Sequence, residues 1–407
     1  MNSICAGPWC AVALAALGAP AWSQTTTRVS VDPSGAQVLD GSSSAALSAN
    51  GGFVAFVSYS NALVWGDTNG ASDTFVRDRR IRTTQRANLT SSGAQTHAGA
   101  NASLSADGRF VAFTSDAVDV VPGDLNGWDD AFVRDRVAGT TELVSVSSSG
   151  AQGNFPSSMW SAPSISADGR YVAFASAASN LVAGDTNGFA DVFVHDRQTH
   201  VTQRVDVSSA GAQSNDDIGY LARVALSADG RYVAFESWAS NLVAGDTNAK
   251  CDVFVRDLVG ATTTRVSVGA ALAQANNNSF SVALSGTGRW VAFMSVATNL
   301  VAGDVNGVND AFVHDRQTGV TERVSVRSTG AEANLQCNGY PTLSADGRFV
   351  AFESLANNLV AQDTNADWDV FLRDRQTATT TRISVNSFGA QAHGASRSPA
   401  ISGNGRF

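Results

Sequence analysis

The 407-residue chain has few of the residues that usually carry catalysis or transition-metal binding. It contains five histidines and four cysteines, and neither a His-x-x-x-His nor a Cys-x-x-Cys pair occurs. It contains no Gly-x-Ser-x-Gly motif and no phosphate-binding loop, so the nucleophile of many hydrolases is missing. It has no run of lysine and arginine and a net charge of −9, which argues against nucleic-acid binding.

Long apolar segments are also missing. The apolar run Ala11–Ala19 is too short to span a bilayer, and the small residues expected at a cleavage site follow at Ala21–Ser23. We therefore interpret residues 1–23 as a secretory signal peptide, although the first ten residues carry no lysine or arginine. The alternatives are a wrongly assigned start codon or a loosely ordered tail. No later segment is apolar enough to be transmembrane, so a soluble mature protein is expected.

What the chain does contain is a repeat. The frame Asp-x-Asn-x-x-x-Asp, followed by an apolar run that ends in Asp, occurs six times. The copies begin, at intervals of 57 to 61 residues, at Asp67, Asp124, Asp185, Asp246, Asp304 and Asp363. A period this regular indicates a repeat architecture.

Each repeat contains four strand signals, which are clearest in the third copy. β-branched and aromatic runs at 162–166, 170–176, 191–196 and 201–207 are separated by turn residues. The second and third runs are apolar on both faces, as in a sheet that packs between two others. Four-stranded antiparallel sheets repeated around an axis form a β-propeller, and this all-β fold is favoured over a linear β-solenoid.

The repeat motifs also resemble those of a known family. Ser-Ala-Asp-Gly-Arg-(Phe/Tyr)-Val-Ala-Phe at 105–113, 166–174, 227–235 and 344–352 is similar to the Ser-Pro-Asp-Gly-Lys-x-Ile-Ala-Phe element of TolB-type, WD-like propeller repeats. The resemblance implies a periplasmic or secreted interaction platform. The chain departs from that family in its longer loop between the second and third strands, and no binding residue of TolB is matched, so TolB's partners do not carry over.

The two ends predict how the ring closes. The mature chain, residues 24–407, opens on a fourth strand at 27–31 and ends on a first strand at 398–402 and the start of a second. We therefore expect six complete blades plus parts of a seventh, in a product truncated at its C-terminus within that blade. The alternative is a six-bladed ring with stray ends.

The repeated frame is the strongest candidate for a site. Oxygens at positions 1, 3 and 7 of a tight loop are typical of calcium loops, although no copy has the acidic residue at position 12 of an EF-hand. The candidate Ca²⁺ ligands are Asp67, Asn69, Asp73, Asp124, Asn126, Asp130, Asp185, Asn187, Asp191, Asp304, Asn306, Asp310, Asp363, Asn365, Asp367 and Asp369. The sixth copy is the richest. The alternative is ordinary turn chemistry, in which these side chains bind backbone N–H groups of their own loop.

Other candidates are residues that recur or that break the repeat. The Asp-Arg pair after the third strand is interpreted as a turn former with a surface or inter-blade partner. His195 and His314 stand where other repeats have arginine. Four aromatic residues interrupt the repeat and are expected either to bind a partner or to pack between loops: Trp128, Phe155, Trp160 and Trp368.

The cysteines predict no disulfide framework. Cys5 and Cys10 leave with the predicted signal peptide, and Cys10 precedes the apolar run, so it is not a lipobox cysteine. Cys251 and Cys337 lie two repeats apart in non-equivalent positions, too far apart for a disulfide to be expected, and are therefore predicted to be free thiols.

In a propeller the loops between the second and third strands, and those between blades, emerge on one face, which we call the long-loop face. Loops on a rigid scaffold commonly bind partners. The sequence predicts a monomeric, non-enzymatic platform for a protein or glycan, periplasmic or extracellular, with possible calcium loops. The alternatives are a propeller-type polysaccharide lyase or glycosidase, or the docking part of a longer enzyme, and near-uniform repeats argue against a single active site.

Overall fold

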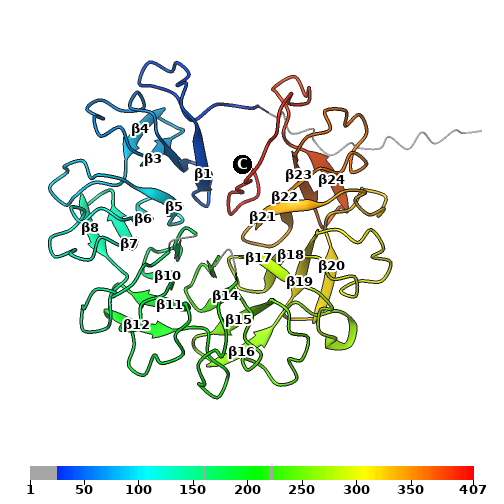
Figure 1. Cartoon of the computed structure of the whole chain (residues 1–407). Helices are drawn as coiled ribbons and strands as arrows, with labels where there is room; N and C mark the ends of the chain where they lie inside the picture. Colours follow the sequence, from blue (N-terminus) through cyan, green and yellow to red (C-terminus); the bar gives the residue numbers. More distant parts are fainter. Residues whose placement is uncertain (1–24, 159–160, 220–222) are drawn as a thin grey trace, which may run out of the picture.

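The computed structural model describes residues 25–158, 161–219 and 223–407, which form six four-stranded antiparallel sheets around a ring (Figure 1). In every sheet the strands follow chain order. Blades one to three consist of β1 (Ser42–Leu47), β2 (Phe53–Ser58), β3 (Asp73–Asp78), β4 (Thr83–Arg86); β5 (Ala100–Leu104), β6 (Phe110–Ser115), β7 (Asp130–Asp135), β8 (Thr140–Leu143); β9 (Ser164–Ile165), β10 (Tyr171–Ser176), β11 (Asp191–Asp196) and β12 (Val201–Arg204). Blades four to six consist of β13 (Ala225–Leu226), β14 (Tyr232–Ser237), β15 (Asp252–Asp257), β16 (Thr262–Arg265); β17 (Ser279–Leu284), β18 (Trp290–Ser295), β19 (Asp310–Asp315), β20 (Val320–Arg323); β21 (Cys337–Leu343), β22 (Phe349–Ser354), β23 (Asp369–Asp374) and β24 (Thr379–Arg382).

The prediction of an all-β propeller with four-stranded antiparallel blades is therefore confirmed for six blades. In the third blade the observed β10 and β11 agree with the predicted runs to within a residue. The first strand is shorter than predicted, because only Ser164 and Ile165 of the predicted 162–166 pair with β10. The only helix in the described residues is the short 3₁₀ helix η1 (Ala270–Leu272).

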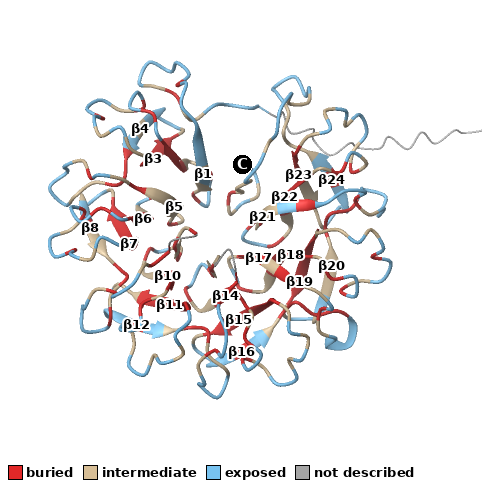
Figure 2. Ribbon diagram, in the orientation of Figure 1, coloured by how far each residue is buried: buried red, intermediate tan, exposed pale blue. Residues whose placement is uncertain are grey.

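The middle two strands of each blade form the core, while the outermost strands mix exposed, half-buried and buried residues (Figure 2). In every blade a phenylalanine of the second strand stacks on one of the third, with ring centroids 5.6–6.0 Å apart. Ala173 and Val194 on the other face of the third blade pack against Phe235 of the fourth. The recurring alanine lets the next blade approach, and each buried phenylalanine contributes roughly 1.5–3 kcal/mol.

A belt of backbone hydrogen bonds joins the tight turns between first and second strands. One residue in each turn takes part, and its backbone N–H donates to the carbonyl oxygen of the corresponding residue in the next turn at 2.8–3.0 Å. In order, these residues are Ala49, Ala106, Ala167, Ala228, Gly286, Ala345 and Gly403. The N–H of Asn404 donates to Ala49 O at 3.1 Å and closes the belt. A seventh turn, at 402–407, therefore stands between blades six and one, but the described strands form no seventh sheet.

Several predictions concern residues outside the described ranges: the signal peptide with Cys5 and Cys10, and Trp160. Cys251 and Cys337 are free and buried, as predicted. Burial raises the pKa of the Cys337 thiol to about 12, so this thiol is neutral at physiological pH. Within the described ranges, no helix has the length and apolar character needed to cross a membrane.

Candidate functional site

The long-loop face is formed by 59–72, 116–129, 177–190, 238–251, 296–309 and 355–368, together with the loops between blades. Within each of these loops the frame asparagine organises the backbone. In the third blade Asn187 Oδ1 accepts the N–H of Phe189 at 3.2 Å, and Asn187 Nδ2 donates to Asp191 Oδ1 at 2.8 Å. The turn chemistry that was the alternative to calcium binding is therefore present in the loop.

An arginine at the end of the fourth strand pairs with the aspartates of the frame in five of the six blades. In the third blade Arg204 Nη2 lies 3.0 Å from Asp185 Oδ1, and Arg204 Nε lies 3.7 Å from Asp191 Oδ2. The five arginines, 2.8–3.4 Å from the first aspartate and 3.3–3.7 Å from the last, are Arg86, Arg204, Arg265, Arg323 and Arg382. Sequence reasoning missed this partner, although the arginine recurs at the end of Thr-Thr-Gln-Arg-type segments.

These guanidinium groups supply the positive charge that a bound cation would otherwise supply. The carboxylates they neutralise are nearly inaccessible to solvent, and burial raises the pKa of Asp252 and Asp310. In the described ranges no group of three or more histidine, cysteine, aspartate or glutamate side chains is arranged to hold a metal ion. A calcium ion in any of these five loops would have to compete with the arginine.

The sixth loop, the richest in acidic residues, does not gather its four predicted ligands. Asp363 and Asp369 face Arg382 and the side-chain amide of Gln391. Asp367 instead accepts the backbone N–H of Trp368 at 2.8 Å. The alternate spacing of oxygens in the sequence therefore does not converge on one point in this loop.

The second blade is the exception. Its fourth strand ends in Leu143, and among the described residues no arginine forms a salt bridge with Asp124 or Asp130. Their partner is the amide of Gln152, whose Nε2 donates to Asp124 Oδ1 at 2.6 Å and to Asp130 Oδ2 at 2.9 Å. Asp124 is 3% exposed, and its Oδ2 atom is buried without a hydrogen-bond partner. Burial raises the pKa of Asp130 to about 6 and also raises the pKa of Asp124, so this pair is short of positive charge.

An exposed aromatic pair joins this loop to the connection between β8 and β9. Trp128 and Phe155 are 45% and 50% exposed, and their rings stack with centroids 6.3 Å apart at an angle of 13°. Trp368, the aromatic candidate of the sixth loop, is buried beneath the guanidinium of Arg397, which lies 4.6 Å from its ring centroid. Trp368 therefore packs, whereas Trp128 and Phe155 stack on each other between two loops and remain about half exposed.

A second set of residues lies on or beside the first strands of the blades, which are their innermost strands. Glu236 on β14 is buried, and its Oε2 accepts the N–H of Ser281 at 2.7 Å. Arg223, just before β13, places its guanidinium 4.4 Å from the ring centroid of Tyr340 on β21. Glu353 of the sixth blade holds the same place and accepts the N–H of Ser398 at 3.1 Å, so the glutamate recurs in two blades. Arg223 and Tyr340 stand at a position where other blades have serine, asparagine or alanine, and sequence reasoning missed their contact.

The recurring Asp-Arg pair and the histidines have structural roles. Asp196 accepts the N–H of Gln198 at 2.9 Å in the turn and forms a bidentate ion pair with Arg170 at 2.6–2.8 Å. His195 and His314 are buried, and their Nδ1 atoms lie 2.9 Å from threonine hydroxyls, as the arginine nitrogens at the same position do at 3.0–3.1 Å. Burial lowers the pKa of both histidines to about 4.

No protein-family model matches the sequence, and no curated protein matches it. Among solved structures, TolB from Acinetobacter baumannii aligns over 76% of this chain and 59% of its own at 13% identity, with a TM-score of 0.42. An oligogalacturonate lyase in complex with manganese aligns over 83% of this chain and 75% of its own at 11% identity, with a TM-score of 0.50. At these identities the similarity concerns the fold alone.

Proposed function

We propose that this chain is a secreted or periplasmic binding platform, without enzymatic activity, that engages a protein or glycan through its long-loop face. The observation that carries the proposal is the exposed stack of Trp128 and Phe155. Flat aromatic surfaces held on a rigid scaffold are favoured anchors, because they bury a large area at little cost in conformational entropy. The stack also marks one blade among six similar ones, and a specific site needs such asymmetry.

We propose calcium for the second loop, next to the aromatic stack. Asp124 and Asp130 are the carboxylates of the frame that lack an internal arginine in the described residues. Rotation of the Gln152 amide would turn its oxygen toward the same point, which would add a third oxygen ligand to the two carboxylates. In the other five loops the arginine stiffens the same frame from within.

The binding role is tested with the double variant Trp128→Ala/Phe155→Ala against a panel of polysaccharides and peptides. The matched control is Trp65→Ala/Phe388→Ala, because these residues are 90% and 97% exposed on loops of the same face. We expect binding to fall at least tenfold in the first variant and to persist in the second. Equal binding by both variants would remove the aromatic stack as the anchor.

A polysaccharide lyase or glycosidase, or the docking part of a longer enzyme, is the second candidate. It is favoured by the contact between Arg223 and Tyr340, which break the repeat beside the innermost strands, where an enzyme's unique residues would converge. Release of unsaturated or reducing sugar from polysaccharides, lost in Arg223→Ala, would support this candidate over the first.

A further inference from the structure

On the face opposite the long loops, an aromatic side chain of one blade lies on the tight turn of the next. An arginine that follows the third strand of that next blade covers the ring. Arg316 shows the arrangement: its Cζ lies 4.4 Å from the ring centroid of Tyr232, and its Nη1 donates to Gly288 O at 2.6 Å. The ring–arginine pairs of this kind are Phe53 with Arg136, Phe110 with Arg197, Tyr232 with Arg316, Trp290 with Arg375, and Phe407 with Arg79.

The fourth blade breaks this series, because Leu258 stands where the arginine is expected. The backbone is unchanged: the N–H of Leu258 donates to Arg231 O at 2.9 Å, as that of Arg316 donates to Arg289 O at 3.0 Å. Only the side chain differs. The ring of Tyr171 therefore has the guanidinium of its own blade's Arg170, 4.8 Å from its centroid, and lacks the second one.

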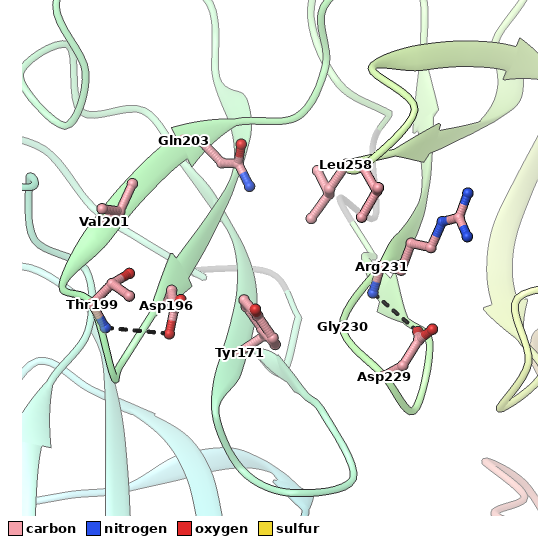
Figure 3. Close-up of a pocket in the computed structure, with 10 residues that line it drawn as sticks. Tyr171, Asp196, Thr199, Val201, Gln203, Asp229, Gly230, Arg231 and Leu258 are labelled. Atoms are coloured by element: carbon pink, nitrogen blue, oxygen red, sulfur yellow. Dashed lines mark hydrogen bonds between the residues drawn. The ribbon is translucent and has the colours of Figure 1, made fainter.

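A pocket of about 330 Å³ lies where the guanidinium is missing. Figure 3 shows Tyr171 and Gln203 on one side of it and Gly230, Arg231 and Leu258 on the other. The rim also carries Asp229, which makes no salt bridge within the described ranges.

Each group that holds the internal arginines has a counterpart in this pocket. Tyr171 corresponds to the covered ring, and Gly230 to the glycine whose carbonyl oxygen accepts from the guanidinium. Gln203 corresponds to Gln85, whose Oε1 accepts from Arg136 Nη2 at 2.8 Å. Leu258 has no donor to offer these acceptors.

We propose that this pocket binds a guanidinium group, supplied by an arginine side chain of a partner protein. A planar guanidinium meets the ring face and the two acceptors together, as Arg136 does with Phe53, Gly108 O and Gln85 Oε1. An ammonium group has no planar fork with which to do the same. Asp229 adds the negative charge that such a ligand requires. The site lies on the face opposite the long loops, so it is independent of the proposed role of the long-loop face.

The test uses Nα-acetyl-L-argininamide as the probe, and saturation-transfer NMR measures its binding to the whole chain. Nα-acetyl-L-citrullinamide, which has the same shape without the charge, and Nα-acetyl-L-lysinamide are the matched ligands. We expect the arginine probe to bind at least tenfold more tightly than the citrulline probe, and more tightly than the lysine probe.

Two variants place the binding in the pocket. Leu258→Arg restores the internal guanidinium and is expected to weaken probe binding at least tenfold while raising the melting temperature. Arg136→Leu opens the equivalent position beside Phe53, where Gln85 and Gly108 O remain as acceptors, and is expected to add a second site. Equal binding of the arginine and citrulline probes, or unchanged binding in a folded Leu258→Arg variant, would overturn the proposal.

Discussion

The ring of Phe407 covers Gly51 so closely that a β-carbon on this glycine would collide with the ring atoms Cγ and Cδ2. The guanidinium of Arg79 lies on the same ring, 4.3 Å from its centroid. The contact repeats the one made by Phe110 on Gly169 and by Tyr232 on Gly288. The segment 402–407 therefore occupies the place between blades six and one in the same way as the turn of a blade.

Phe407→Ala tests whether this contact stabilises the ring. Phe407 is 43% exposed, so we expect a loss of about 1–2 kcal/mol, below the cost of removing a fully buried phenylalanine. The measurement is the free energy of unfolding in urea, with the 97% exposed Phe388→Ala as the control. An unchanged midpoint for Phe407→Ala would mean that the segment does not help to close the ring.

Gly169→Ala tests the same type of contact inside the ring. Gly169 has φ +76°, and a β-carbon there would collide with the ring of Phe110. We expect a loss of roughly 3 kcal/mol, from the left-handed backbone and from overpacking together. Gly188→Ala is the matched control, since it has a similar φ of +74° but no atom within 4 Å of the added carbon. The difference between the two variants in urea unfolding isolates the clash, and equal losses would contradict it.

The period, the strand pattern and the turn residues were sufficient to predict the propeller, because each local signal agrees with the four-stranded blade. The candidate loops were predicted as a set, but the role of each loop was not. What distinguishes Asp124 from Asp185 is a residue about twenty positions later, Leu143 against Arg204, and their contact depends on how the fourth strand pairs in the blade. The sequence of a single loop does not contain the arginine that neutralises its aspartates, because that arginine lies at the end of the fourth strand.

The ion pairs predict a large cost for removing one arginine. Arg204→Leu would leave Asp185 and Asp191 buried without positive charge, and the loss of one partner of a buried pair costs about 3–5 kcal/mol. Urea unfolding measures the loss. The converse variant, Leu143→Arg, supplies the second blade with the missing partner and is expected to stabilise the protein. Stability that is insensitive to both changes would contradict the role assigned to these arginines.

Calcium is expected to stabilise the protein through the second loop. Each tenfold excess of Ca²⁺ over its dissociation constant adds about 1.4 kcal/mol at one site, so the melting temperature should fall on adding EGTA. Asp124→Asn/Asp130→Asn and Leu143→Arg should each abolish this response, whereas Asp363→Asn should leave it intact. No response to EGTA in the wild-type protein would reject calcium binding, and a response lost in Asp363→Asn would move the site to the sixth loop.

His195 and His314 predict a loss of stability in mild acid. Burial lowers the pKa of both to about 4 in the folded state, below the ordinary value of 6.5, so between these values the unfolded chain binds more protons. Stability contributed by the neutral histidines is therefore present above pH 6.5 and is lost as the pH falls toward 4, by up to about 3 kcal/mol for each. Other blades place arginine at these positions and bond the same threonine, so His195→Arg/His314→Arg should flatten the unfolding free energy across this window. His393→Gln, at an exposed histidine, should retain the slope, and an equal slope in all three proteins would assign the acid sensitivity to other groups.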